Sequence, residues 1–190
     1  MKTLVKWTIS DYHKMIESDI LTGRNCELIE GEIIEMSPEL PQHYNTVKRS
    51  VNYLATLLQG KADVRFNGPI TLSNSEPEPD IAIVKLPEYT YNQHHPYPDD
   101  IFWLIEVANT SLSKDLSIKR KIYAQAQITE YWIINLSTQE LIVFRNPENG
   151  DYLVEVKWQE PIIKSLAFPD IEIMISQIMF SGTGCCSKNE

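Results

Sequence analysis

The sequence predicts one α/β domain with a mixed central β-sheet flanked by helices. Apolar segments of strand length alternate with segments of helical periodicity, and such patterns are typical of helices packed against a sheet. No internal repeat or linker divides the chain, whose 190 residues are enough for one hydrophobic core. We therefore expect a single domain over residues 1–180 and a disordered tail over 181–190.

The N-terminal third is expected to form a helix, a hairpin and a second helix. The segment 7–19 predicts a short helix, because Thr8–Asp11 has the spacing of a capping box. The segment 26–38 predicts a hairpin that turns at Glu30–Gly31. Apolar residues recur at helical spacing over 43–60, and Gly60 is a typical helix stop.

The middle of the chain is expected to supply three strands. Strands are predicted over 63–72 and 81–86, separated by a polar, proline-rich loop. A long irregular connection follows over 87–100. The run 101–109 is almost entirely apolar, which predicts a central strand covered on both faces.

The C-terminal part is expected to return to the sheet through one more helix. Helical periodicity extends over 114–127. Three further strands are predicted over 130–136, 140–146 and 152–158, joined by turn-forming residues.

Composition limits the classes of function. The net charge of −9 argues against a protein that coats nucleic acid, because such binding depends on many Lys and Arg side chains near phosphates. An enzyme that meets nucleic acid through one local basic patch remains compatible, and the densest basic cluster is 113–121.

Targeting and cysteine signals are absent. No stretch reaches the roughly 18 apolar residues of a membrane span, and the N-terminus lacks an apolar signal core. We expect a cytoplasmic protein. The three cysteines have neither the spacing of a disulfide framework nor that of a zinc site.

Glu106 is the one charge within the apolar run 101–109. An unpaired carboxylate in a buried strand would cost several kcal/mol, so Glu106 needs a cation nearby. The partner is either a lysine or arginine in a structural ion pair, or a metal ion.

Asp80 stands immediately before the predicted strand 81–86. Two neighbouring strands would bring Asp80 and Glu106 within reach of one ion. Paired carboxylates with a backbone carbonyl, that of Val107, suit Mg²⁺ or Mn²⁺, which prefer oxygen ligands. The alternative for Asp80 is a loop aspartate that caps backbone amides.

Lys119 breaks the pattern of the predicted helix 114–127. At about 100° per residue, it falls in the middle of the apolar stripe that contains Leu116 and Tyr123, on the face turned toward the sheet. Together with Asp80 and Glu106, Lys119 would complete a metal-dependent phosphodiesterase site, in which the amine stabilises charge on the phosphate. The alternative is a buried stem with the amine in water.

Several segments resemble the Uma-type restriction endonuclease family of the PD-(D/E)xK nuclease superfamily. The similarity covers nearly the whole chain and rests on four segments, ELIEGEIIEMSP, PEPDIAIV, LIEVANTSLSKDLSIKRKIYAQAQITEYWIINL and FPDIEIMI. It implies a restriction-endonuclease-like fold and a Mg²⁺- or Mn²⁺-dependent DNA endonuclease. It also implies that Asp80 and Glu106 are metal ligands.

The resemblance also bears on the lysine and on two further residues. The superfamily's usual lysine position, two residues after Glu106, is Ala108 here. In this family the lysine lies in the following helix, which matches Lys119. Glu32 and His43 fall at positions that resemble recurring family residues, where Glu32 would add a carboxylate and His43 would contact a phosphate or a water. The alternatives are an exposed hairpin charge and a residue of the first helical turn.

The partner expected from the resemblance is DNA, and most nucleases of this fold act as dimers, so a homodimer is expected. The alternative function is a non-catalytic module that binds DNA or a partner protein on the same fold. The net charge of −9 and the displaced lysine favour that alternative.

Overall fold

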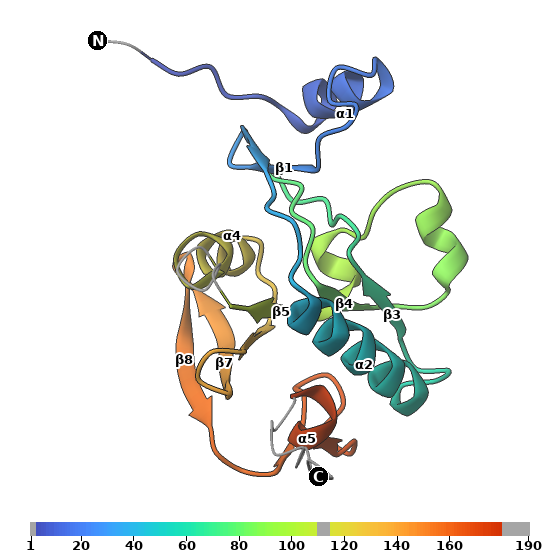
Figure 1. Ribbon diagram of the computed structural model, residues 1–190, viewed down its shortest axis with the longest axis vertical. Helices are drawn as coiled ribbons and strands as arrows, with labels where there is room; N and C mark the ends of the chain where they lie inside the picture. The colour runs from blue at the N-terminus through green and yellow to red at the C-terminus, as the bar shows by residue number, and fades with distance from the viewer. Residues whose placement is uncertain (1–2, 110–114, 180–190) are drawn as a thin grey trace, which may run out of the picture.

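A six-stranded mixed sheet forms the centre of the computed structural model, which describes residues 3–109 and 115–179 (Figure 1). The strand order is β3-β4-β5-β6-β7-β8, in which β5 and β6 are parallel and all other neighbours are antiparallel. The strands are β3 (Asp63–Phe66), β4 (Ile81–Val84), β5 (Ile101–Ala108), β6 (Glu130–Asn135), β7 (Glu140–Glu148) and β8 (Asp151–Trp158). The expected α/β class with a mixed sheet is confirmed, whereas the tail over 181–190 lies outside the described residues.

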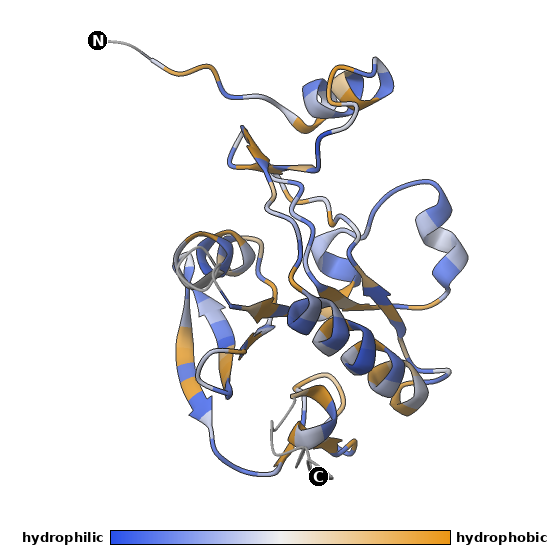
Figure 2. Ribbon diagram, in the orientation of Figure 1, coloured by the Kyte–Doolittle hydropathy of each residue, from blue (hydrophilic) through white to orange (hydrophobic). Residues whose placement is uncertain are grey.

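Helices cover both faces of this sheet. On one face, α2 (Pro41–Leu57) and α5 (Ile175–Ile178) pack on a core that includes Ile83 and Trp103. On the other face, α4 (Arg120–Gln125) packs on a core that includes Leu104 and Ala108. Because side chains alternate along a strand, neighbouring residues of β5 serve opposite cores. Figure 2 shows hydrophobic and hydrophilic stretches alternating along α2, as an amphipathic helix requires.

The N-terminal elements lie beyond the sheet. The helix α1 (Ile9–Glu17) begins with a capping box in which Thr8 and Asp11 bond each other's backbone amides, as predicted. A separate hairpin of β1 (Cys26–Ile29) and β2 (Glu32–Glu35) follows. Its turn residues, Glu30 and Gly31, have φ of 48° and 76°, the left-handed conformation that two-residue hairpins need.

The remaining differences from the sequence prediction have local causes. The strand predicted over 63–72 ends at Phe66, because Asn67 adopts a φ of 45° and leaves the extended conformation. The connection 87–100 contains two short 3₁₀ helices, Glu88–Asn92 and Pro98–Asp100. The short strands β9 (Ile162–Ile163) and β10 (Ile173–Met174) were not predicted, since two residues cannot carry a periodic pattern.

The helix predicted over 114–127 begins differently from an ordinary α-helix. Its first described turn, Asp115–Lys119, is π-helical, and α4 continues from it. No helix in the described part of the chain is long and apolar enough to cross a membrane.

Replacing Leu54 by Ala should destabilise the fold strongly. Leu54 lies on α2 and is fully buried in the core that this helix forms with the sheet. Its truncation therefore leaves a cavity, which costs about 2–5 kcal/mol of unfolding free energy. Chemical denaturation measures this loss. The exposed Asn52→Ala on the same helix is the control, and equal stabilities of the two variants would contradict the packing described.

Candidate active site

Asp80 and Glu106 come from facing positions on two adjacent strands. Ile81 of β4 pairs with Ile105 of β5 in antiparallel register, so Asp80, one residue before β4, lies across from Glu106. The backbone amide of Val107 donates to Asp80 Oδ2 at 2.6 Å. Both residues therefore lie at the same end of the sheet, on neighbouring strands.

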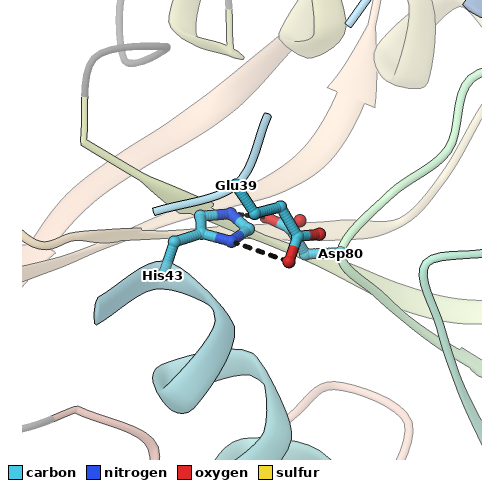
Figure 3. A group of neighbouring side chains, drawn as sticks. All are labelled: Glu39, His43 and Asp80. Atoms are coloured by element: carbon cyan, nitrogen blue, oxygen red, sulfur yellow. Dashed lines mark hydrogen bonds and ion pairs between the residues drawn. The ribbon is translucent and has the colours of Figure 1, made fainter. Parts of the chain in front are cut away.

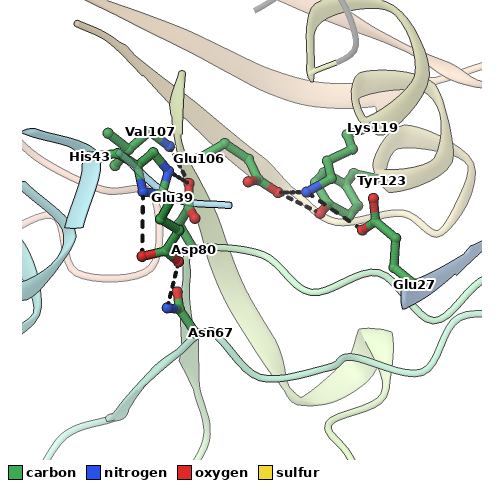
Figure 4. Close-up of polar contacts among 9 residues, drawn as sticks. All are labelled: Glu27, Glu39, His43, Asn67, Asp80, Glu106, Val107, Lys119 and Tyr123. Atoms are coloured by element: carbon green, nitrogen blue, oxygen red, sulfur yellow. Dashed lines mark hydrogen bonds and ion pairs between the residues drawn. The ribbon is translucent and has the colours of Figure 1, made fainter. Parts of the chain in front are cut away.

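Glu106 is 3% exposed and faces the helix that follows its strand. Its Oε1 accepts hydrogen bonds from Lys119 Nζ at 2.8 Å and from Tyr123 Oη at 2.9 Å. Figure 4 shows the Glu106 side chain pointing toward these two residues, whereas Asp80 lies on the side of His43. The cation that a buried carboxylate requires is therefore, in this structure, the amine of Lys119.

Lys119 is the last residue of the π-helical turn and is 5% exposed. Its burial agrees with the helical periodicity, which places it on the face toward the sheet. A π-helical turn widens the helix locally and is frequent at functional sites. Tyr123 of α4 is fully buried beside Glu106. Burial and the charge of Glu106 raise the pKa of Tyr123 well above the usual value, so its hydroxyl remains a hydrogen-bond donor at neutral pH.

A second group of potential ligands gathers around Asp80. Single ligand atoms of Glu39, His43 and Asp80 all lie within 4.8 Å of one another (Figure 3). His43, in the first turn of α2, has Nε2 at 3.1 Å from Asp80 Oδ2 and Nδ1 at 3.9 Å from Glu39 Oε2. Asn67 Nδ2 donates to Glu39 Oε1 at 2.8 Å. The contacts of the Asp80 carboxylate are therefore to this group and to the Val107 amide, whereas Glu106 contacts Lys119 and Tyr123.

These groups line a hollow of about 540 Å³. Among its described lining residues are six carboxylates and one lysine, together with His43; the carboxylates are Glu27, Glu35, Glu39, Glu78, Asp80 and Glu106. Burial, with a smaller contribution from the charge of Glu27, raises the pKa of Glu78. Oxygen donors in such excess fit a divalent cation.

Glu32 does not belong to this hollow. Its carboxylate pairs with Lys6 Nζ at 2.7 Å, and its side chain is 53% exposed. The expectation that Glu32 adds a carboxylate to the site is corrected, because the strand β2 turns this side chain to the surface.

The hairpin supplies two other carboxylates to the hollow, Glu35 of β2 and Glu27, and the buried one of the two is Glu27. It lies on β1, is 1% exposed, and has Oε2 at 3.8 Å from Lys119 Nζ. Glu27 was not predicted from the sequence, although it shares the signal of Glu106, a single acid between apolar residues of a strand. Glu39 was also missed, and nothing in its local sequence marks it.

The basic cluster predicted over 113–121 is only partly available to a ligand. Residues 113 and 114 lie outside the described residues. Arg120 pairs with Asp151 at 2.5 Å and with Glu155 at 2.7 Å, and it stacks over Phe144. Arg120 therefore anchors α4 to β8.

Replacing Lys119 by Met should destabilise the protein by about 3–5 kcal/mol, since it removes the cation from a buried ion pair. Urea unfolding at neutral pH measures the change. The matched control is Lys121→Met, two residues further along and exposed, which should stay within about 0.5 kcal/mol of wild type. Equal effects of the two substitutions would show that Lys119 does not neutralise the buried acids.

Comparison with known proteins bears on the fold and the family of the chain. The chain is similar in fold to the crystal structure of a putative nuclease belonging to DUF820 from Anabaena variabilis ATCC 29413, with a TM-score of 0.66 and 17% identity over 90% of this chain and 96% of that chain. No curated protein matches the sequence. The family model of Uma2, described as putative restriction endonuclease, matches residues 9–176. The chain therefore belongs to the Uma2 family and has a nuclease-type fold.

Proposed function

We propose that this protein is a divalent-metal-dependent endonuclease that hydrolyses phosphodiester bonds of DNA. The observation that carries the proposal is the meeting of Asp80, Glu106 and Lys119 at one hollow, where carboxylates outnumber amines. Membership of the Uma2 family supports the same chemistry.

The carboxylates of Asp80 and Glu106, with the backbone carbonyl of Val107, would hold the cation. Their donor atoms are oxygens, which Mg²⁺ and Mn²⁺ prefer. A cation bound there supplies a water of lowered pKa and screens the negative charge of the phosphate.

Lys119 is the group we assign to the phosphate itself. Its amine is buried beside Glu106 at 2.8 Å, and a fixed positive charge in a dry site stabilises the charge that develops on the phosphoryl oxygens. Ala108 occupies the position two residues after Glu106, so Lys119 supplies the amine from the helix instead of the strand.

His43 has two roles open to it in this scheme. Its Nε2 lies at 3.1 Å from Asp80 Oδ2, which suits a residue that orients Asp80. Its grouping with Glu39 and Asp80 also suits a ligand to the same cation or to a second one.

A non-catalytic module that binds DNA or protein is the second candidate. The net charge of −9 and Ala108 at the usual lysine position favour it. In either case we propose a single domain over residues 1–180 and a homodimer, whose mass light scattering would measure.

Incubation of supercoiled plasmid DNA with the protein tests the function. With Mg²⁺ or Mn²⁺ we expect nicking that EDTA abolishes. Asp80→Asn, Glu106→Gln and Lys119→Met should each lower the rate roughly 100-fold or more, because each removes a charge that acts on the phosphate or the cation.

The controls are Glu30→Gln and Lys121→Met, two exposed positions outside the hollow, with folding of every variant checked by circular dichroism. Intact plasmid under all metal conditions, together with a gel shift, would favour the binding module. Nicking that survives in Glu106→Gln would contradict the assigned site.

A further inference from the structure

Glu27 is a buried acid in an unusual place. Its strand β1 is only four residues long, and all four are buried, although the hairpin is separate from the six-stranded sheet. The side chain of Glu27 has no measurable exposure. Burial of an ionised carboxylate costs several kcal/mol unless it is paired and hydrogen-bonded, so its contacts indicate what the acid does there.

Two contacts of Glu27 are directed at the hollow. Its Oε2 lies at 3.8 Å from Lys119 Nζ, and the same oxygen accepts a long hydrogen bond of 3.4 Å from the backbone amide of Glu78. Glu78 belongs to the segment that leads into Asp80. Glu27 thus connects the hairpin to Lys119 and to the segment that leads into Asp80.

Lys119 consequently lies between two carboxylates from different parts of the fold. Glu106 of β5 approaches the amine at 2.8 Å, and Glu27 of β1 approaches it at 3.8 Å. Figure 4 shows the two acids on opposite sides of the lysine amine. With one acid alone, the lysine side chain would retain more conformational freedom, because its four-carbon stem is flexible.

We propose that Glu27 is a positioning residue for Lys119, which holds the amine in place opposite Glu106 and makes the hairpin β1–β2 part of the active site. The consequence for phosphodiester hydrolysis rests on the function proposed above. The consequence for the position of the amine does not depend on it.

Glu27→Gln tests the role in catalysis, because the amide keeps the shape and the hydrogen bond from Glu78 but loses the charge that attracts Lys119. In plasmid nicking with Mn²⁺, kcat should fall roughly ten- to hundredfold, since a small misplacement of a catalytic group has effects of this size. KM should stay within about twofold, because the fully buried side chain of Glu27 is out of reach of a substrate in the hollow. Glu30→Gln, in the same hairpin and exposed, is the control.

Chemical labelling tests the position of the amine without any cleavage. Metal-free protein is treated briefly with acetic anhydride, and acetylation is measured by mass spectrometry after chymotryptic digestion. Lys119 should be protected in wild type and labelled several-fold faster in Glu27→Gln. The exposed Lys121 serves as an internal reference whose labelling should not change.

Continued protection of Lys119 in Glu27→Gln, with kcat within twofold of wild type, would overturn the proposal and leave Glu27 a structural acid. If wild type does not cleave DNA, the proposed function fails and the labelling decides the positioning role alone. If Glu27→Gln does not fold, Glu27→Asp replaces it, because a carboxylate shorter by one methylene withdraws from the amine and should likewise expose Lys119.

Discussion

The site depends on one buried ion pair within a negatively charged hollow. Lys119 donates to Glu106 at 2.8 Å, and both side chains are almost fully buried. The lining contains six carboxylates in the part of the chain that the structure describes, so one amine neutralises only a small part of the local charge. Such a hollow repels a bare phosphate and attracts cations. A bound divalent ion would therefore stabilise the site by neutralising its carboxylates. It would also reduce the repulsion between the hollow and the phosphates of a nucleic acid.

The fold brings these groups together from five separate segments. Antiparallel pairing of β4 with β5 places Asp80 across from Glu106. The turn Asp115–Lys119 directs the lysine back onto β5, and the start of α2 directs His43 toward Asp80. The hairpin adds Glu27, whose Oε2 lies at 3.8 Å from the amine of Lys119. An arrangement of charged groups from separate segments needs a rigid scaffold, which the two cores on either side of the sheet provide.

The parts that the sequence predicted are those whose signals are local. A charge within an apolar strand marks Glu106, and helical periodicity marks Lys119. The structure buries both, Glu106 in β5 and Lys119 on the side of its helix that faces the sheet, as their sequence patterns predict. Glu32 and Glu27 show the limit: both are hairpin acids, and which of them points inward depends on pairing and on contacts with distant residues. Residues such as Glu39 reach the site only through tertiary structure, because no periodic pattern surrounds them.

Diffraction from a crystal of the protein soaked in Mn²⁺ tests the central claim most directly, through the anomalous signal of the ion. The account predicts one Mn²⁺ with oxygens of both Asp80 and Glu106 at about 2.0–2.4 Å, while the amine of Lys119 remains beside it. An ion held by Glu39, His43 and Asp80 without Glu106, or no ion at millimolar Mn²⁺, would contradict the account.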